Sequence, residues 1–459
     1  MVTPNTDTIA AIATGGIVSA IGIVRVSGPA SIGLMDALFR PADGKPMSAH
    51  ADRTLVYGSL LDREGEVLDI CLCTVSRAPN SYTGENTAEL QCHGSPVVLR
   101  AALDSLFSRG ARQALAGEFT RRAFLNGRLD LTRAEAVIDI IEAQTPLAAR
   151  NAAGQLSGAV QRAADAVYEH LGDICSHYHA VLDYPDEDIE PFTLAQYAGT
   201  LRTEAQSLER LLGTFERGQY LDRGIPTAIV GKPNAGKSSW LNTLLGYERA
   251  IVTDIPGTTR DTLSEGCVVG GVPLRLTDTA GVRETTDAVE TLGVERALGA
   301  AESAELLLTV FDLSRPWDAE DERICALAEK ARHAVALCNK CDLPAVWDAS
   351  SLKGRFDAVC VVSAREGEGL DAVAAAVKAL FPLPEAAAGE ILTNARQFSA
   401  VSRAAEYLRA AVGAMEGGWP PDAVLTECEG AMAALGELTG RLVREDVTDK
   451  IFSRFCVGK

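Results

Sequence analysis

Apolar and polar residues alternate along the first part of the chain in a pattern that predicts mixed α and β structure. Residues 22–26 alternate as a half-buried strand does, and residues 70–75 form a nearly continuous apolar run. Residues 97–107 have the spacing of an amphipathic helix, whereas residues 79–84 are rich in turn formers. We therefore expect residues 1–120 to form an N-terminal α+β domain.

The rest of the chain changes between helical periodicity and a succession of short strands and helices. Helical spacing dominates residues 121–180, 194–217 and 395–455, and a Pro-Asp-Glu-Asp run at 185–188 separates the first two. From residue 227 to 381, short apolar runs alternate with helical segments, which is typical of a doubly wound α/β sheet. These runs occupy residues 228–230, 274–276, 306–311, 335–337 and 359–362.

This order predicts a discontinuous helical domain with an α/β domain inserted into it. The helical domain would contain residues 121–217 and 395–459, and the α/β domain residues 218–383. Insertion is tolerated where the two ends of a domain lie close together. The alternative is that the two helical segments form separate domains. In both cases we expect a multidomain fold with α+β, all-α and α/β parts.

Composition narrows the classes of protein to which the chain can belong. Its 459 residues are enough for about three domains. With 47% hydrophobic and 23% charged residues, it is not a long disordered chain, a collagen or a coiled-coil rod. The 62 acidic residues outnumber the 43 Lys and Arg residues, and the formal charge of −19 disfavours a general binder of nucleic acids. Residues 100–133 are a local exception, with seven arginines against three acidic residues, and could either hold a polyanion or pair with acidic helices.

The cysteines and the N-terminal segment favour a cytoplasmic protein. Eleven scattered cysteines indicate a reducing compartment rather than a disulfide framework. Cys338 with Cys341, and Cys175 with two nearby histidines, are weak candidates for zinc sites. Residues 9–24 are uncharged but contain three glycines, and they are shorter than the ~20 residues of a membrane-spanning helix. The first eight residues contain no Lys or Arg, unlike a signal peptide, so no membrane association is expected.

Residues 231–238, Gly-Lys-Pro-Asn-Ala-Gly-Lys-Ser, fit the GxxxxGK[ST] pattern of a phosphate-binding loop. The segment follows a predicted strand and precedes a predicted helix, so backbone N–H groups and a helix N-terminus can face phosphate oxygens. Lys237 is placed for the β- and γ-phosphates, and the Ser238 hydroxyl for Mg²⁺. The predicted nucleotide contacts in this segment are Asn234, Ala235, Gly236, Lys237, Ser238 and Ser239.

Further motifs, each after a predicted strand, indicate that the nucleotide is GTP. The carboxylate of Asp342, in Asn339-Lys340-Cys341-Asp342, can accept from N1–H and the 2-amino group of guanine, which adenine lacks. Asp278, in Asp278-Thr279-Ala280-Gly281, would hold Mg²⁺ through water, and Gly281 would sense the γ-phosphate. The other predicted nucleotide contacts here are Thr258, Thr259, Thr279, Ala280, Asn339, Lys340, Ser363, Ala364 and Arg365.

The residue after the Asp-x-x-Gly motif leaves the catalytic mechanism open. Many GTPases position the attacking water with a glutamine at this place. Here the residue is Val282, which cannot orient water. The nearby acids Glu284, Asp287 and Glu290 are candidates for this role, although each could equally be a solvated loop charge.

Several longer segments are similar to the MnmE (TrmE) family of tRNA-modification GTPases, and the resemblance extends from about residue 7 to residue 459. The segments that carry it are Pro-Asn-Ser-Tyr-Thr-Gly-Glu-Asn at 79–86, Glu-Leu-Gln-Cys-His-Gly at 89–94, Gly-Glu-Phe-Thr-Arg-Arg-Ala-Phe-Leu-Asn at 117–126, Gly-Thr-Thr-Arg-Asp at 257–261 and Phe-Cys-Val-Gly-Lys at 455–459. The resemblance implies an N-terminal domain that binds folate and dimerises, a helical domain, and an inserted Ras-like GTPase domain.

The same resemblance implies roles for individual residues. Glu290 would position water, with Lys237 and Thr259 as further catalytic residues and Ser238 and Thr259 as ligands of Mg²⁺. A K⁺ ion would take the place of an arginine finger, where positive charge stabilises the transition state. Its implied ligands are Asn234, Thr253, Ile255 and Thr258, and Thr253 is also an implied nucleotide contact. The implied contacts of 5-formyl-tetrahydrofolate, or of a related folate, are Arg25, Glu89, Arg128 and Lys459.

The implied activity is K⁺-stimulated hydrolysis of GTP by a homodimer with pairing GTPase domains. With a flavin-dependent partner (MnmG or GidA), in a heterotetramer, the protein would modify C5 of the wobble uridine of certain tRNAs. The added group would be of the carboxymethylaminomethyl or aminomethyl type and would use the one-carbon unit of the folate. GTP would close the two GTPase domains, and release of phosphate after hydrolysis would reopen them.

Some residues depart from the family pattern, and two other functions stay open. Arg128 stands where Lys is common, Trp240 replaces a usual Leu, and residues 14–20 differ from the first loop of the family. Cys456 could be a reactive thiol near the chain end. A ribosome-assembly GTPase would leave residues 79–94 unexplained. A folate-dependent one-carbon transferase with a regulatory GTPase would act without a partner.

Overall fold

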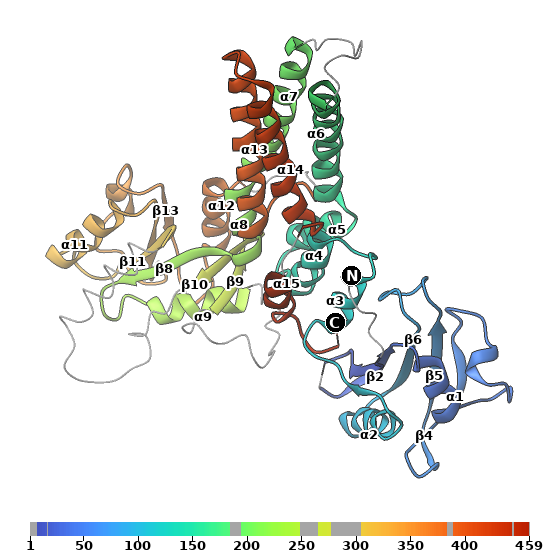
Figure 1. Ribbon diagram of the computed structural model, residues 1–459. Helices are drawn as coiled ribbons and strands as arrows, with labels where there is room; N and C mark the ends of the chain where they lie inside the picture. The colour runs from blue at the N-terminus through green and yellow to red at the C-terminus, as the bar shows by residue number, and fades with distance from the viewer. Residues whose placement is uncertain are drawn as a thin grey trace. The chain divides into compact units, whose positions relative to one another are not determined.

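The computed structural model describes most of the chain as two compact units (Figure 1). The three-domain division predicted above stays a prediction, because predicted helical segments belong to both units. The first unit comprises residues 1–138, 156–202 and 406–459, and the second comprises residues 139–155 and 203–405. The residues described are 7–15, 17–183, 194–247, 265–276, 304–382, 389–442 and 445–458.

A seven-stranded sheet forms the N-terminal part of the first unit (Figure 1). Its strand order is β3-β4-β5-β6-β2-β1-β7, and all neighbouring strands are antiparallel except β1 and β7. Helices α1 (Ser31–Leu38) and α2 (Pro96–Phe107) pack on one face. The strands are β1 (Ile9–Ile12), β2 (Ser19–Ser27), β3 (Phe39–Pro41), β4 (Val56–Leu61), β5 (Val67–Ser76), β6 (Thr87–Gly94) and β7 (Arg112–Gln113).

Alternation along the strands decides which side chains enter the core of this sheet. In β2, Val24 and Val26 are buried under the helices, whereas Arg25 between them belongs to the opposite face. The predicted strands at 22–26 and 70–75 are confirmed within β2 and β5, and the predicted helix at 97–107 is α2.

Long stretches with helical spacing are divided into separate helices. The prediction of one helix over residues 121–180 is wrong, because Gly127 and Gly158 adopt positive φ angles and Pro146 begins a new helix. Residues 194–217 are likewise split, near Gly213. The helices are α3 (Glu118–Leu125), α4 (Leu131–Glu142), α5 (Pro146–Leu156), α6 (Ala159–Asp183), α7 (Leu194–Leu212), α8 (Phe215–Arg223), α13 (Ala395–Glu416), α14 (Pro421–Thr439) and α15 (Glu445–Phe452).

Contacts between helices build the rest of the first unit. Helix α6 packs along α14, and α15 packs on α3 (Figure 1). The predicted break at 185–188 lies outside the described residues. Among the helices that the structure describes, none is both long and apolar enough to span a bilayer.

A six-stranded sheet organises the second unit and confirms the doubly wound α/β prediction. Its order is β13-β12-β11-β8-β10-β9, and only β9 and β10 pair antiparallel. The five predicted strands are all present, whereas β9 was not predicted. The strands are β8 (Ile225–Gly231), β9 (Glu265–Val269), β10 (Val272–Leu276), β11 (Leu306–Asp312), β12 (His333–Asn339) and β13 (Ala358–Val361).

Helices cover both faces of this sheet, so its parallel strands are apolar on both sides. One core lies between the sheet and helices α9 (Lys237–Tyr247) and α12 (Leu370–Leu380), and it contains the fully buried Trp240. The other core lies under α11 (Ala319–Ala328) and contains Phe311. Because the parallel strands end at one edge of the sheet, the loops that follow β8, β12 and β13 gather there.

A buried arginine ties three segments of the first unit together. Arg122 is only 1% exposed, and its guanidinium binds the carboxylates of Asp7, Glu85 and Glu118 at 2.8, 3.1 and 3.0 Å. Burial alone would raise the pKa of Glu118, but hydrogen bonds from Arg112, from Leu115 N–H and from Arg122 outweigh it and lower that pKa. This network joins the segment just before β1, the loop before β6 and α3.

We expect Arg122→Met to destabilise the first unit by about 3–5 kcal/mol, because it leaves the largely buried carboxylate of Glu85 without its cation and removes one of the two arginines that bind Glu118. Hydrogen exchange in β1 and α3, followed during urea unfolding, measures the loss. Arg63→Met is the control and should change stability little, because Arg63 is an exposed arginine paired with its neighbour Glu64.

A lowered carboxyl pKa stabilises the fold at neutral pH, and this stabilisation disappears as the pH falls below about 4. An equally steep acid transition in Arg122→Met would contradict this assignment.

Candidate active site

The phosphate loop of the second unit connects β8 to α9. Asn234 has φ of +63° and Gly236 has φ of +105°, which turns the backbone sharply before the helix begins at Lys237. A Cβ atom on Gly236 would lie 2.1 Å from Nδ2 of Asn339, so only glycine fits. The loop therefore has the conformation and the position that a phosphate-binding loop requires.

Lys237 points back into this loop. Its ammonium donates to the carbonyl oxygens of Gly231 and Lys232, both at 2.8 Å. Burial lowers the pKa of Lys237, and the carbonyl groups supply hydrogen bonds but no countercharge. A phosphate placed in the loop would add the missing negative charge.

Asn339, at the end of β12, links three loops. Its side-chain amide donates to the carbonyl of Ala235 at 2.8 Å and accepts from the N–H of Ala364 at 3.0 Å. Thr243 of α9 donates to the Ala364 carbonyl at 3.1 Å. The phosphate loop, the Asn-Lys-Cys-Asp motif and the Ser-Ala segment after β13 are thus joined.

The residues predicted to read the base have defined orientations. Ser363 donates its hydroxyl to Oδ1 of Asp342 at 2.7 Å, which holds this carboxylate in place. Lys340 has φ of +67°, and its ammonium binds Asp312 at 2.6 Å. Cys341 donates its backbone N–H to Val362, so it links the motif to the last strand of the sheet.

Part of the predicted catalytic set lies outside the described residues, so its roles stay predictions. These residues are Thr253, Ile255, Thr258, Thr259, Asp278, Thr279, Ala280, Gly281, Val282, Glu284, Asp287 and Glu290. Ser238 and Ser239 begin α9, next to Lys237, and Arg365 is exposed beside Glu366. The structure thus describes the phosphate loop and the base-reading loops together.

A second group of predicted residues meets in the first unit. Arg25 of β2 lies opposite Glu89 of β6, and Nε of Arg25 is 2.8 Å from Oε1 of Glu89. The guanidinium also lies over the rings of Tyr82 and Phe119, at 5.7 and 5.8 Å from their centroids. Arg25 and Glu89 therefore act as one unit on the sheet face that α1 and α2 leave uncovered.

The loop at 79–86 and the chain end border this pair. Arg25 donates to the carbonyl of Gly458 at 3.5 Å, and Val457 forms a bridge with Ala116. The side chain of Arg128 packs beside Gly84, in the same loop as Tyr82. Lys459 lies outside the described residues, and Cys456 is exposed. Three of the four predicted folate contacts are thus placed around one loop or its neighbouring strands.

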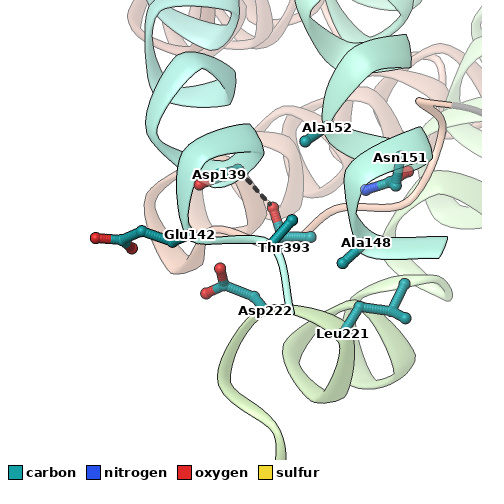
Figure 2. Close-up of a pocket in the computed structure, with 9 residues that line it drawn as sticks. Asp139, Glu142, Ala148, Asn151, Ala152, Leu221, Asp222 and Thr393 are labelled. Atoms are coloured by element: carbon teal, nitrogen blue, oxygen red, sulfur yellow. Dashed lines mark hydrogen bonds between the residues drawn. The ribbon is translucent and has the colours of Figure 1, made fainter. Parts of the chain in front are cut away.

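A small pocket elsewhere in the second unit contains none of the predicted site residues (Figure 2). Figure 2 shows Asp139 hydrogen bonded to Thr393, at 3.3 Å, with Glu142 and Asp222 nearby. Asn151 binds the backbone of residues 389–391, with its amide at 3.1 to 3.3 Å from their polar atoms. These bonds attach α5 to residues 389–391.

Two contacts of the phosphate loop were not predicted from the sequence. Lys232, an unspecified position in the phosphate-loop pattern, binds Asp318 and Asp321 at 2.8 and 2.7 Å. Asp318 also caps α11 by accepting from the N–H groups of Glu320 and Asp321. The acidic first turn of α11 is the sequence signal that could have predicted this cluster of carboxylates, because a helix N-terminus favours negative charge.

Two family models match the chain, and together they extend over almost all of it. The MnmE helical domain matches residues 131–456, and the GTP-binding protein TrmE N-terminus matches residues 8–128. The chain is 42% identical over 455 residues to the tRNA modification GTPase MnmE of Symbiobacterium thermophilum, with 99% of each chain covered. It is 43% identical over 457 residues to the protein of the same name in Chloroflexus aurantiacus, with 99% of this chain and 100% of the relative covered.

Solved structures give a much weaker likeness. Era of Aquifex aeolicus, bound to GDP and AlF4⁻, is 26% identical and has a TM-score of 0.26, covering 39% of this chain and 65% of that one. The fold is therefore judged from the strand order and the loop contacts described above. Together with the full-length relatives, they establish that the chain belongs to the family of the tRNA modification GTPase MnmE, whose members hydrolyse GTP in tRNA modification.

Proposed function

We propose that this chain couples GTP hydrolysis to modification of C5 of the wobble uridine in certain tRNAs, as a cytoplasmic homodimer with a flavin-dependent partner. The group added is of the carboxymethylaminomethyl or aminomethyl type, and its one-carbon unit comes from a formyl-tetrahydrofolate. The observation that carries this proposal is that one chain holds both a joined set of guanine-nucleotide loops and a separate Arg25–Glu89 pair beside the chain end.

The described loops support a division of labour in nucleotide binding. We assign the phosphates to the N-terminus of α9 and Lys237, and the guanine base to Asp342. Ser363 orients the Asp342 carboxylate at 2.7 Å, so its oxygens are arranged before guanine arrives. Asn339 keeps the phosphate loop at a constant separation from the base-reading loops through its bond to Ala235.

Cations complete this site in the proposal. The Ser238 hydroxyl, in the first turn of α9, and Thr259 hold Mg²⁺, which neutralises phosphate charge. The donor set assigned to K⁺ is Asn234, Thr253, Ile255 and Thr258, and of these the described residue is Asn234. Its φ of +63° belongs to the turn of the phosphate loop. The oxygen of its neutral side-chain amide is a suitable ligand for a monovalent cation. Glu290 orients the attacking water, and Lys237 and Thr259 stabilise the charge that develops.

The Arg25–Glu89 pair supports a folate site. A carboxylate such as Glu89 can accept from pterin N–H groups, and Arg25, Arg128 and Lys459 can bind carboxylates of the glutamyl tail. Burial raises the pKa of Tyr82, whose ring lies beside Arg25, so this phenol stays neutral and offers an apolar face. An apolar wall with a few oriented charges is the usual lining of a small-molecule site.

Lys232 is assigned as a positioning residue of the phosphate loop. We expect Lys232→Met to raise the KM for GTP roughly fivefold, with a smaller effect on kcat, because it removes a charge-assisted hydrogen bond that holds the loop. Lys232→Arg should restore most of the affinity. Lys330→Met, at an exposed lysine just after α11, is the control and should leave KM unchanged. A fall in kcat alone would reject the positioning role.

Potassium dependence tests the cation site. The purified chain should hydrolyse GTP at least ~10-fold faster in K⁺ than in Na⁺ buffer, because preorganised positive charge stabilises the transition state. Asn234→Ala should remove this preference. Asn242→Ala, in the exposed part of α9, should keep it. Equal rates of the unmodified chain in the two salts would leave a GTPase without the proposed cation site.

Arg25→Gln separates the two sites. The variant should lose formyl-tetrahydrofolate binding in calorimetry by roughly 10-fold or more, since a charge-assisted hydrogen bond is lost, while its GTP hydrolysis is unchanged. In a deletion strain it should fail to restore modified wobble uridine, measured by mass spectrometry of tRNA nucleosides. Arg40→Gln, at an exposed arginine of β3, should restore it. Equal amounts of modified wobble uridine in the deletion strain and the parent strain would overturn the tRNA assignment.

A further inference from the structure

Three potential metal ligands meet on two neighbouring strands of the first unit, on the sheet face opposite to Arg25. Cys71 of β5 and Cys92 of β6 are next to each other in the antiparallel register, one step beyond the pair Leu72 and Gln91. The two sulfur atoms and a carboxylate oxygen of Asp69 all lie within 4.8 Å of one another. Among the described residues, this is the one cluster of three such ligands with this spacing.

The cluster is sequestered from water, and its carboxylate is oriented. Cys71 and Cys92 are 6% and 2% exposed, and the side chain of Asp69 is 9% exposed. Asp69 accepts from the backbone N–H of His93 at 2.9 Å and from the N–H of Ile70 at 2.8 Å, and its other contact is Nδ1 of His93 at 2.8 Å. Second-layer hydrogen bonds of this kind orient carboxylate ligands in metal sites.

We propose that Asp69, Cys71 and Cys92 bind a divalent cation of the zinc class, joining β5 to β6. Two thiolates and a carboxylate are ligands that Zn²⁺ accepts, with Zn–S bonds of about 2.3 Å and Zn–O bonds of about 2.0–2.2 Å. Tetrahedral ligands at these lengths lie somewhat under 4 Å apart, so small side-chain rotations bring the three atoms to the metal. The fourth ligand is a water molecule or the second oxygen of Asp69.

The charges of the cluster favour a cation over a disulfide. A bound cation would pair with the Asp69 carboxylate and would hold both cysteines as thiolates. Simple apolar packing would explain two buried cysteines but not a carboxylate oriented toward them.

The site is independent of the proposed folate function, although it lies in the same sheet. Strand β6 carries Cys92 on the core face and Glu89 on the other face. A metal at the cluster would fix β5 against β6 at the end of the strand where α2 begins. Its effect would be on the stability of the sheet, so metal binding can be tested without tRNA, folate or GTP.

The test uses the full-length chain, reduced and treated with a chelator. Titration with Co²⁺ alone should produce one equivalent of a thiolate-to-cobalt charge-transfer band, and Zn²⁺ should displace it. Cys92→Ala should abolish the band, and Asp69→Asn, which keeps both thiols, should weaken Co²⁺ binding at least ~10-fold. Cys428→Ala is the matched control. This buried cysteine of α14 lies beside Cys175 of α6, outside the cluster. It should leave the band unchanged.

Other results would overturn the proposal. No charge-transfer band, or a band that persists in Cys92→Ala, would exclude the site. A Cys71–Cys92 disulfide found by peptide mapping after diamide oxidation, in a chain that binds no Co²⁺, would make the cluster a redox pair instead. Circular dichroism of each variant checks folding. If Cys92→Ala does not fold, Asp69→Asn decides, and an affinity equal to that of the unmodified chain would reject the carboxylate ligand.

Discussion

The side-chain amide of Asn339 is the contact on which the nucleotide site depends. It binds the carbonyl of Ala235 in the phosphate loop and the N–H of Ala364 after β13, using one donor and one acceptor of the same group. Asn339 is 2% exposed, so these bonds form where water cannot replace them. Gly236 completes the arrangement, because any side chain there would collide with the amide. The separation between the phosphate loop and the loop after β13 is therefore built into the fold.

Sequence patterns predicted the second unit better than the first. Parallel strands buried on both faces give continuous apolar runs, and motifs directly after such runs must gather at one sheet edge. This is why Asn339, Asp342 and Ser363 could each be predicted as nucleotide contacts from the order of motifs and strands. Strand β9 was missed because it is short and leads into an antiparallel hairpin through Gly270 and Gly271.

The first unit shows what such patterns cannot predict. Strand β4 contains Gly58, where a Cβ would lie 2.3 Å from the carbonyl of Arg40, a constraint that only the folded sheet reveals. The helical pattern of apolar residues showed no interruption at Gly127 and Gly158. The helices on each side of these glycines each have an apolar face, so the sequence looked like one helix. The ion pairs of Arg122 join residues that are 37 and 115 positions away. No local pattern records such contacts, so Arg122 looked like part of a basic segment.

The contact between Arg25 and Gly458 has a consequence for protein synthesis. The two residues are separated by 433 positions, so β2 leaves the ribosome long before the segment that completes its surroundings. A nascent or prematurely terminated chain can form β1 and β2 and can still lack the last wall of the Arg25 site. Completion of this site therefore waits until the segment around Gly458 has been synthesised, so the two parts of the site form at different stages of synthesis.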